Sequence, residues 1–524
     1  MNGAESLVRA LVADGVDVCF TNPGTSEMHF VSALDRVPGM RCVLGLFEGV
    51  VTGAADGYWR IADRPASTLL HLGPGLANGL ANLHNAKKAH SGIVNIVGEH
   101  GSAHVALDAP LTSDIEGIAR PMSNWVRTSR SASDVARDGR HAVAQARRAP
   151  GHIATLILPA DTAWGEVDPA AQVGAAPEVP PASAASPDAV VRAARVLATA
   201  RAVPTLLLVG GNALREGALA NAGRIAAATG CRLMSEFAAG RVQRGAGRVV
   251  APRVPYVVEA ALEALAPFRR IVLAGARVPV AFFAYPGKPG RLVAPDCEIV
   301  TLADFDQDPA GALDALVREL GAQAHAPAGV AERVPRDRRG ALPTGAVTPE
   351  GVGHVLGALL PENAIVVDEA VTSSRGFGPP TATAGPHDWL TSTGGSIGFG
   401  LPTATGAAIA APERKVLALE GDGSAMYTLQ SLWTIARESL DVCAVIFANR
   451  AYRILHGEFV AVGGGQPGPR ATDMLSLDRP ALDWVALARG MGVEASQATD
   501  LESFATQLAR AMSRRGPALI ELVL

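Results

Sequence analysis

Short apolar runs alternate with segments of helical periodicity along the whole chain. Most of these runs are followed within a few residues by Gly, Asp, Asn or Pro, which commonly end strands and start turns. A strand followed by a helix, repeated many times, is typical of parallel sheets covered by helices on both faces. The pattern therefore predicts an α/β fold with doubly wound parallel sheets. The clearest apolar runs are Ile93–Val97, Ala154–Leu158, Thr205–Val209, Arg270–Ala274, Ile365–Val367, Val416–Leu419 and Val442–Phe447.

Two segments interrupt this alternation and divide the chain. Residues 166–188 are rich in Ala and Pro, and residues 322–347 carry repeated Pro and Arg. A chain of 524 residues is long enough for about two to four domains. We therefore predict three α/β domains, which span residues 1–165, 185–325 and 345–524.

Composition and charge exclude several classes of protein. Hydrophobic residues make up 48% of the chain and charged residues 18%, as in a compact globular enzyme. The net charge of −4 offers no basic surface for nucleic acid. The first residues lack the features of a signal peptide, and no apolar stretch is long enough for a membrane span. Five scattered cysteines without a Cys-x-x-Cys pair suit buried thiols in a reducing cytoplasm.

Two polar motifs follow apolar runs in the last part of the chain. They are Gly421-Asp422-Gly423-Ser424 and Ala448-Asn449-Arg450-Ala451-Tyr452. Mg²⁺ prefers hard oxygen ligands and commonly shares them with phosphate groups. The Asp422 carboxylate, the Asn449 amide oxygen and the Ala451 carbonyl would supply three such oxygens. Glycines allow a phosphate to approach the backbone, and a helix beginning at the serine would favour an anion, so we predict a magnesium and diphosphate site.

These motifs resemble the cofactor motif of thiamine-diphosphate-dependent enzymes, in which Gly-Asp-Gly is followed at a similar distance by two asparagines. One position departs, because Ala448 stands where the first asparagine is usual. Gly-Asp-Gly alone is a common turn. However, further motifs of the family occur in the same order and cover nearly the whole chain. They are Asn22-Pro23-Gly24-Thr25, Gly45–Val51 with Ala54-Ala55-Asp56-Gly57-Tyr58, Gly73–Asn78 and Gly394–Pro402.

The resemblance implies a different role for each domain. In this family the first domain binds the aminopyrimidine ring of thiamine diphosphate, the middle domain is structural, and the last domain binds the diphosphate. Glu48 would bind the pyrimidine N1′ and activate the cofactor, although in isolation it looks like an ordinary helix-surface glutamate. In this family that glutamate faces the diphosphate site of another subunit, so a homodimer or homotetramer is implied.

The resemblance also assigns the other cofactor contacts. Ile397 matches the large apolar residue that bends the cofactor, the Gly395 carbonyl would accept from the 4′-amine, and Thr372 aligns with a diphosphate contact. A core isoleucine and a turn hydroxyl are the plain alternatives, and we expect Ile397 to be buried either way. The predicted cofactor set is Pro23, Glu48, Asn78, Thr372, Gly395, Ile397, Gly421, Asp422, Gly423, Ser424, Asn449 and Tyr452, with the metal on Asp422, Asn449 and Ala451.

Substrate chemistry is assigned to His71, which precedes Gly73-Pro74-Gly75. In benzoylformate decarboxylases a histidine at this place serves the substrate, whereas acetolactate synthases usually have a small hydroxyl residue there. A histidine can donate to a carboxylate or relay a proton near neutral pH; a histidine satisfied in the core is the alternative. Thr25 aligns with a serine that contacts the substrate carboxylate. Glu48, His71 and Thr25 are therefore the predicted catalytic residues.

Two departures put the identity of the substrate in question. Phe282 stands where the decarboxylase has a second active-site histidine, and Leu455 stands where pyruvate decarboxylase has a catalytic glutamate. His456 and Glu458 follow closely and could partly replace the missing group. A solvated loop is the simpler interpretation of both.

Flavin is not expected. The segment Gly275–Pro279 lacks the acidic and basic run that follows the corresponding strand of the flavin-binding synthases. A Gly-x-Gly-x-x-Gly occurs at residues 463–468, but it neither follows a clear strand nor opens a helix, and proline interrupts it.

The predicted function is thiamine-diphosphate-dependent, non-oxidative decarboxylation of a 2-oxo acid. Capture of the intermediate by a second carbonyl would make the protein an acetolactate synthase-like carboligase. A C–C hydrolase or lyase, an FAD-containing oxidase of the same fold, and a cofactor-binding protein without turnover also stay open. The sequence does not specify the substrate side chain.

Overall fold

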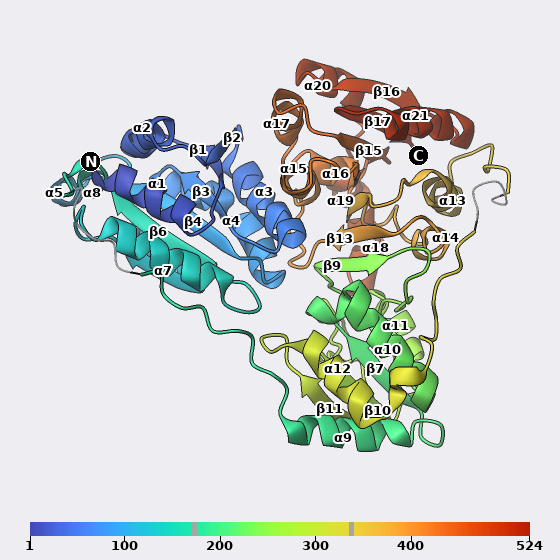
Figure 1. The fold of residues 1–524 in the computed structure, drawn as a ribbon. Helices are drawn as coiled ribbons and strands as arrows, with labels where there is room; N and C mark the ends of the chain where they lie inside the picture. The colour runs from blue at the N-terminus through green and yellow to red at the C-terminus, as the bar shows by residue number, and fades with distance from the viewer. Residues whose placement is uncertain (169–174, 335–339) are drawn as a thin grey trace.

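The computed structural model describes residues 1–168, 175–334 and 340–524, and it contains three β-sheets covered by helices (Figure 1). We call the residues before, between and after the two gaps the first, middle and third lobes. The sheets have six, four and seven strands, and nearly all neighbouring strands are parallel. The predicted α/β fold with three doubly wound parallel sheets is confirmed. None of the helices in the described ranges has the length and apolarity needed to cross a bilayer.

The first sheet has the strand order β2-β1-β3-β4-β6-β5 and is parallel throughout. Separate apolar clusters cover its two faces, which explains why the central strands β3, β4 and β6 are buried at every position instead of alternating. The strands are β1 (Val18–Asn22), β2 (Arg41–Leu44), β3 (Ala66–Leu70), β4 (Ile93–Glu99), β5 (Trp125–Thr128) and β6 (Ile153–Pro159). The helices are α1 (Gly3–Ala13), η1 (Thr25–Glu27), α2 (Met28–Arg36), α3 (Glu48–Ala62), α4 (Leu72–Lys88), α5 (Ser102–Val105), α6 (Ile115–Ala119), α7 (Val135–Arg147) and α8 (Ala160–Trp164).

The middle sheet has the order β11-β10-β7-β8 and is also parallel. Its strands are β7 (Thr205–Val209), β8 (Arg232–Ser235), β10 (Arg270–Ala274) and β11 (Glu298–Ala303). Its helices are α9 (Pro187–Ala198), η2 (Gly211–Leu214), α10 (Glu216–Thr229), α11 (Val258–Leu265), α12 (Pro309–Glu319) and η3 (Ala322–Ala324). After β7 the chain adds β8 on one side of it, and then adds β10 and β11 on the other side. The connections from β7 and β10 therefore run in opposite directions, and a crevice is expected between the carboxyl ends of these two strands.

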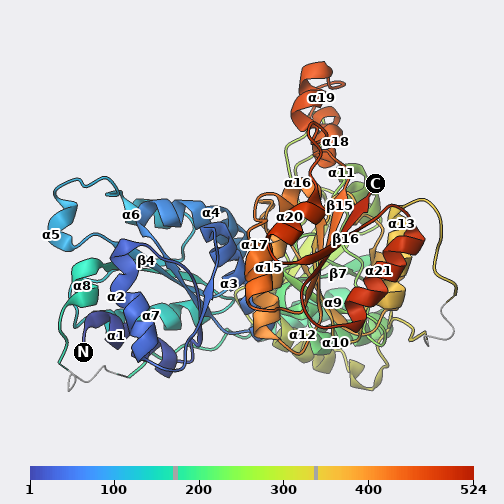
Figure 2. The same cartoon turned by 90° about the horizontal axis from the view of Figure 1, so that it is seen from above.

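The third sheet has the order β16-β17-β15-β14-β12-β13-β9. Its strands are β9 (Arg241–Arg244), β12 (Ile365–Glu369), β13 (His387–Thr391), β14 (Val416–Gly421), β15 (Val442–Ala448), β16 (Glu494–Ala498) and β17 (Ala518–Val523). Its helices are α13 (Pro349–Leu359), α14 (Gly378–Thr381), α15 (Gly400–Ala410), α16 (Asp422–Ala425), α17 (Ser431–Arg437), α18 (Arg453–Ala461), α19 (Pro469–Leu475), α20 (Trp484–Gly490) and α21 (Leu501–Ser513). In the view from above, α18 and α19 project from the rest of the third lobe (Figure 2).

One strand of the third sheet comes from the middle lobe. β9 pairs antiparallel with β13, with Val242 opposite Trp389. The hydrophobic pattern did not predict β9, because its sequence Arg-Val-Gln-Arg has a single apolar residue. This strand ties the middle lobe to the edge of the third sheet.

Capping side chains determine where several helices begin. Ser186, Asp308, Thr348 and Asp500 each accept a hydrogen bond from a backbone N–H in the first turn of the helix that follows. Such caps satisfy donors that the helix itself leaves unpaired.

The first and third lobes meet where α3 packs against α15, and the two backbones approach closely because small residues face each other. A Cβ added at Gly57 would lie 2.1 Å from the Thr403 carbonyl oxygen, and one at Gly406 would lie 1.8 Å from the Ala54 carbonyl oxygen. Backbone atoms cannot turn away as a flexible side chain can. The contact therefore depends on glycine at both positions.

We expect Gly57→Ala to lower the stability of the protein by about 2–3 kcal/mol, because the added methyl group must push α3 away from α15. The matched control is Gly217→Ala in α10, where a Cβ meets nothing within 4 Å. There alanine should be neutral or stabilising by about 0.5–1 kcal/mol, because it is the better helix former. Unfolding midpoints in urea test both. A Gly57→Ala protein as stable as the control would contradict the close packing.

Candidate active site

Three adjacent strands of the first sheet lead to the first group of predicted residues. β1 continues into Pro23 and Thr25, β2 into Glu48, and β3 into His71. Because β1 pairs in parallel with both β2 and β3, the carboxyl ends of all three strands lie at one edge of the sheet. Ligands of open α/β sheets bind at this edge. Thr25 is exposed there, and the other three side chains are half-buried.

Glu48 opens α3, and its carboxylate is held by Asn78. The Asn78 amide donates to Glu48 Oε2 at 3.0 Å. Gly75 lies on the other side, where a Cβ would come within 3.3 Å of Glu48 Oε1. A carboxylate at the N-terminus of a 15-residue helix is stabilised by the unpaired N–H groups of the first turn. Two of the predicted cofactor residues, Glu48 and Asn78, are thus brought together.

A buried glutamate that the sequence analysis did not single out lies against His71. Glu27 Oε2 is 2.7 Å from His71 Nδ1 and accepts a 2.7 Å hydrogen bond from the Gly24 N–H. The Glu27 side chain is fully buried, whereas 23% of the His71 side chain is exposed. Gly24 is required here, because a Cβ would lie 2.3 Å from the His71 ring. No sequence signal distinguishes Glu27 from the acidic residues that are common in the first turn of any helix.

The surroundings of Glu27 have opposite effects on its pKa. Burial raises the pKa of the Glu27 carboxyl group, whereas the Gly24 N–H and His71 lower it. A carboxylate bound to one nitrogen of an imidazole orients the ring. Glu27 therefore holds the His71 ring in one orientation at the edge of the first sheet.

The second group of predicted residues lies at the carboxyl ends of β14 and β15, which are neighbours in the third sheet. Asp422 is buried, and it accepts hydrogen bonds from the N–H of Gly423 at 2.9 Å and of Arg450 at 2.6 Å. Asn449 Oδ1 accepts from the Ala451 N–H at 3.0 Å. The hydrogen bond from the Arg450 N–H therefore ties Asp422 to the turn that carries Asn449 and Ala451.

The oxygens around Asp422 suit Mg²⁺. Within the described ranges, no three His, Cys, Asp or Glu side chains gather as a metal site. A cation at Asp422 would need the amide, backbone and phosphate oxygens that Mg²⁺ accepts. Burial raises the pKa of Asp422, and a bound cation would favour its charged form.

The turn after β14 differs from the prediction in one respect. Helix α16 begins at Asp422 and has four residues, so the prediction of a helix beginning at Ser424 is wrong. Gly421 adopts an extended backbone and precedes the helix, which places Ser424 inside it. A Cβ at Gly423 would lie 2.5 Å from the Tyr452 ring, so glycine lets Tyr452 pack against the turn.

Glu369, at the end of β12, fixes the loop between β13 and α15. Its carboxylate accepts the N–H groups of Gly398, Phe399 and Gly400 at 3.0, 3.1 and 2.7 Å. Glu420 is its register partner in β14 and is also buried. Burial raises the pKa of Glu369 to about 7, and burial beside Glu369 raises the pKa of Glu420 well above its ordinary value. Burial and the neighbouring Glu369 carboxylate therefore both oppose ionisation of Glu420.

The same loop carries Gly395 and Ile397. Gly395 has a φ of +78° and lies against Phe282, whose ring a Cβ would approach to 2.6 Å. Ile397 is half-buried, so the expectation that it would be buried is wrong; the loop keeps it near the surface. Thr372 lies in the turn after β12 and is also half-buried.

We call the group at the carboxyl ends of β1, β2 and β3 the first half-site, and the group at the carboxyl ends of β14 and β15 the second half-site. Among the described residues, no direct hydrogen bond joins the two half-sites. Helix α4 connects the first lobe to the Gly395 loop instead. The Asn82 amide donates to the Gly398 carbonyl at 3.1 Å, and the Asn85 amide donates to the Ser396 carbonyl at 2.9 Å. The first half-site contains Glu48, and the second contains Asp422.

His456 and Glu458 lie on helix α18 and not in a loop. Glu458 accepts hydrogen bonds from the hydroxyls of Tyr256 and Tyr285, at 3.0 and 2.9 Å. The interpretation of Glu458 as part of a solvated loop is therefore wrong. His456 is half-buried, and Leu455 is exposed.

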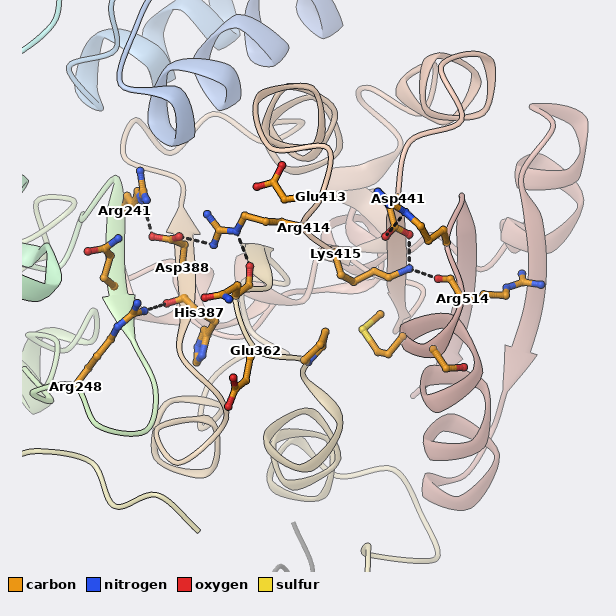
Figure 3. A pocket seen from close by; sticks show the side chains of 16 residues that line it. Arg241, Arg248, Glu362, His387, Asp388, Glu413, Arg414, Lys415, Asp441 and Arg514 are labelled. Atoms are coloured by element: carbon orange, nitrogen blue, oxygen red, sulfur yellow. Dashed lines mark hydrogen bonds and ion pairs between the residues drawn. The ribbon is translucent and has the colours of Figure 1, made fainter. Parts of the chain in front are cut away.

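A cavity of about 530 Å³ lies at the opposite, amino edge of the third sheet (Figure 3). Its principal cations are already paired: Arg241 and Arg414 bind Asp388, and Lys415 binds Asp441. None of the predicted site residues lines this cavity. Its charges hold strand ends together, and we do not count it as part of the active site.

Two family descriptions match the chain. Residues 1–118 match the thiamine pyrophosphate enzyme N-terminal TPP binding domain, and residues 372–522 match the thiamine pyrophosphate enzyme C-terminal TPP binding domain. These ranges contain the first and second half-sites, respectively.

Several known proteins resemble the whole chain. A Mycobacterium tuberculosis protein named "Putative acetolactate synthase large subunit IlvX" is 52% identical over 100% of this chain and 99% of its own length. The benzoylformate decarboxylase of Pseudomonas aeruginosa is 30% identical, over 97% of this chain and 96% of its own. The solved structure of a thiamine diphosphate-dependent 4-hydroxybenzoylformate decarboxylase of Rhodococcus jostii RHA1 superposes with a TM-score of 0.87 at 25% identity, over 99% of this chain and 98% of that one.

Proposed function

Because this chain belongs to the thiamine pyrophosphate enzyme family, we propose that it binds thiamine diphosphate with Mg²⁺ and catalyses the non-oxidative decarboxylation of a 2-oxo acid. The observation that carries this proposal is the pair of His71 and Glu27 at the same sheet edge as Glu48. Relatives named benzoylformate decarboxylase and 4-hydroxybenzoylformate decarboxylase support this choice of reaction.

The cofactor supplies a carbon nucleophile and accepts the electrons released with CO₂. Glu48, held by Asn78, would bind the pyrimidine ring and move a proton at its N1′. Pro23 lies at the same edge. Gly395 and Ile397 would hold the ring from the loop that Glu369 fixes.

The diphosphate and its metal would bind the second half-site. Asp422, the Asn449 side chain and the Ala451 carbonyl would hold Mg²⁺. The diphosphate oxygens would contact the backbone of Gly421–Ser424, together with Thr372 and Tyr452. Gly423 lets the Tyr452 ring pack against this turn because it has no side chain.

His71 and Thr25 would act on the substrate. The imidazole would donate to the substrate carboxylate or deliver the proton that replaces CO₂. The exposed Thr25 hydroxyl could bind the same carboxylate. Glu27 touches neither substrate nor cofactor in this proposal and acts by positioning His71.

We expect Glu27→Gln to lower kcat/KM by about 10–100-fold, because an amide does not stabilise the protonated imidazole as a carboxylate does. Affinity for thiamine diphosphate, measured by fluorescence titration, should not change. In a His71→Ala background the same change should have no further effect, because the two residues act as a unit. Additive losses in the double variant would contradict the coupling.

The alternative is carboligation, in which the intermediate reacts with a second carbonyl compound. It is favoured by the name of the Mycobacterium tuberculosis relative, which refers to acetolactate synthase. Products separate the two reactions: decarboxylation yields an aldehyde, and carboligation yields a hydroxy ketone or hydroxy acid. A C–C hydrolase or lyase would cleave a preformed carbon–carbon bond without releasing CO₂.

We propose that the enzyme does not use FAD. The Glu236 carboxylate lies in the crevice between the carboxyl ends of β7 and β10, where it accepts backbone hydrogen bonds from Gly211 and Arg277 and where a Cβ at Gly210 would lie 2.4 Å from its Oε1. Burial raises the pKa of Glu236 to about 7, while backbone hydrogen bonds from Gly211 and Arg277 oppose the rise. A nucleotide phosphate would have to displace this side chain. Flavin absorbance in the purified protein would support the oxidase alternative instead.

We further propose that the complete site forms between two subunits of a homodimer or homotetramer in the cytoplasm. No direct hydrogen bond among the described residues joins the two half-sites, and all five cysteines are free thiols. If Glu48→Gln and Asp422→Asn subunits are each inactive, mixed dimers should recover about a quarter of wild-type activity, because half of the dimers carry one intact site. Mixing without any recovery would contradict a shared site.

The experiment that tests the function is CO₂ release from a panel of aliphatic and aromatic 2-oxo acids, with and without thiamine diphosphate and Mg²⁺. Cofactor-dependent release is the expected result. No release from any acid would overturn the decarboxylase proposal and favour cleavage of a preformed bond or a protein without turnover.

A further inference from the structure

One side chain of helix α4 binds the backbone of a single residue in the Gly395 loop, which spans residues 392–399 between β13 and α15. The Asn85 amide oxygen accepts a hydrogen bond from the Ser396 N–H at 3.2 Å, and the Asn85 amide nitrogen donates to the Ser396 carbonyl at 2.9 Å. Ser396 lies between Gly395 and Ile397, the residues of this loop that would contact the cofactor. Asn85 therefore holds the loop between its predicted cofactor contacts.

The neighbours of Asn85 determine which end of its amide faces which group. The Asn85 nitrogen also donates to Asn82 Oδ1 at 3.0 Å. The Asn82 nitrogen is itself occupied, because it donates to the carbonyls of Gly49 and Gly398. Both hydrogens of the Asn85 nitrogen thus have an acceptor, and the amide oxygen is left for the Ser396 N–H. The hydrogen-bond network therefore fixes the orientation of the Asn85 amide.

The contact between α4 and the loop is close. Asn85 is fully buried, and a Cβ at Gly394 would lie 2.6 Å from its Oδ1. The Thr393 hydroxyl donates to the Asn85 backbone carbonyl at 3.0 Å, and His84 Nε2 lies 3.0 Å from the Gly394 carbonyl oxygen. An unpaired polar group at a buried position is costly, so these bonds hold the loop in one position against α4.

The bond to the Ser396 N–H also sets the direction of the Gly395 carbonyl. The two groups belong to one planar trans peptide unit, in which the C=O and the N–H point in opposite directions. Since the N–H points at Asn85, the Gly395 carbonyl points away from Asn85. Gly395 has a φ of +78°, and a peptide unit next to glycine can rotate with little steric hindrance. A hydrogen bond is therefore needed to hold this carbonyl in one direction.

We propose that Asn85 is a positioning residue for the cofactor: it holds the Gly395–Ser396 peptide so that the Gly395 carbonyl faces the 4′-amine of thiamine diphosphate. This inference rests on the proposed function, because it requires the cofactor to bind at the Gly395 loop. Asn85 does not touch the cofactor in this proposal and acts only through the peptide that it binds.

The first test compares thiamine diphosphate with 4′-deaminothiamine diphosphate, in which a hydrogen replaces the amine. The wild-type protein should bind thiamine diphosphate about tenfold more tightly, because the analogue cannot donate to the Gly395 carbonyl. In Asn85→Ala this preference should fall below about threefold, because the carbonyl is no longer held in place. Affinity for pyrophosphate with Mg²⁺, which would occupy the second half-site alone, should not change. Fluorescence titration measures all three ligands.

The matched control is Asn95→Ala, at another fully buried asparagine of the first lobe. The Asn95 amide joins β3 to β6, because it accepts from the Thr68 hydroxyl at 2.7 Å and donates to the Thr155 hydroxyl at 2.9 Å. This variant should lose stability but keep the preference for the 4′-amine. A preference retained in Asn85→Ala would overturn the positioning role, and so would a wild-type protein that binds both cofactors equally.

Amide hydrogen exchange of the full-length protein without ligands tests the contact itself. Exchange across residues 392–399 should become about tenfold faster or more in Asn85→Ala, because the loop loses its bonds to the Asn85 side chain. Asn85→Ser should give the same result, since a hydroxyl is too short to reach both backbone groups of Ser396, and it replaces Asn85→Ala if that variant does not fold. Unchanged exchange would overturn the contact.

These measurements separate the inference from the function on which it rests. If the wild-type protein binds no thiamine diphosphate, the proposed function fails and the positioning role falls with it. If the wild-type protein binds and uses the cofactor but Asn85→Ala keeps the preference for the 4′-amine, the proposed function stands and only the role of Asn85 is overturned.

Discussion

Glu48→Gln is expected to lower kcat by on the order of 10²–10⁴-fold while thiamine diphosphate still binds. Glutamine has nearly the shape of glutamate, so it can still accept the hydrogen bond from Asn78 that Glu48 Oε2 accepts now. It cannot take up or release a proton at the pyrimidine ring. The loss should therefore appear in the chemical step and not in cofactor affinity.

Steady-state CO₂ release and cofactor titration measure the two quantities separately. The matched control is Glu350→Gln, at a glutamate in the first turn of α13 whose side chain is 86% exposed. This control removes the same charge from the same kind of helix position. Full activity in Glu48→Gln would show that the carboxylate does not transfer a proton. If the wild-type protein has no activity, it is a binding protein without turnover and the substitution has no rate to change.

Asp422→Asn is expected to weaken binding of thiamine diphosphate in the presence of Mg²⁺ by on the order of 100-fold or more. A buried charge that faces a bound cation is worth roughly 2–5 kcal/mol. The asparagine amide would also face one of the two backbone N–H donors that now bind the Asp422 carboxylate, those of Gly423 and Arg450. One donor would be left unsatisfied in a buried place.

Fluorescence titration at several Mg²⁺ concentrations checks this prediction. Asp296→Asn, at an exposed aspartate of the middle lobe, is the control for the loss of one charge. Circular dichroism should show that Asp422→Asn remains folded. Cofactor binding as tight as that of the wild type would remove Asp422 from the metal site.

These two variants distinguish the roles of the two half-sites, because one should change the turnover rate and the other the affinity for the cofactor. The Glu48 variant should bind the cofactor and turn over slowly, whereas the Asp422 variant should recover activity when thiamine diphosphate and Mg²⁺ are raised. If both variants lost only affinity, the first half-site would hold the cofactor without taking part in proton transfer.

The polar contacts of the site were harder to predict than its location. Glu27 and His71 are 44 residues apart, and Tyr256 and Glu458 are 202 residues apart. Hydrophobic periodicity reports how each segment is buried, but not which distant side chain it meets. Glu369 and Glu420 become neighbours only through the register of β12 and β14.

The sequence by itself determined the α/β architecture, because strands buried on both faces are largely apolar along their length. It also predicted that the motifs that follow parallel strands lie at the carboxyl edge of their sheet. Only the tertiary structure decided the partners of those residues: Glu27 behind His71, the tyrosines around Glu458, and polar β9 at the edge of the third sheet. The physical reason is that the burial of a segment follows from its own pattern of apolar and polar residues, whereas contacts between distant segments depend on strand register and on the paths of the loops.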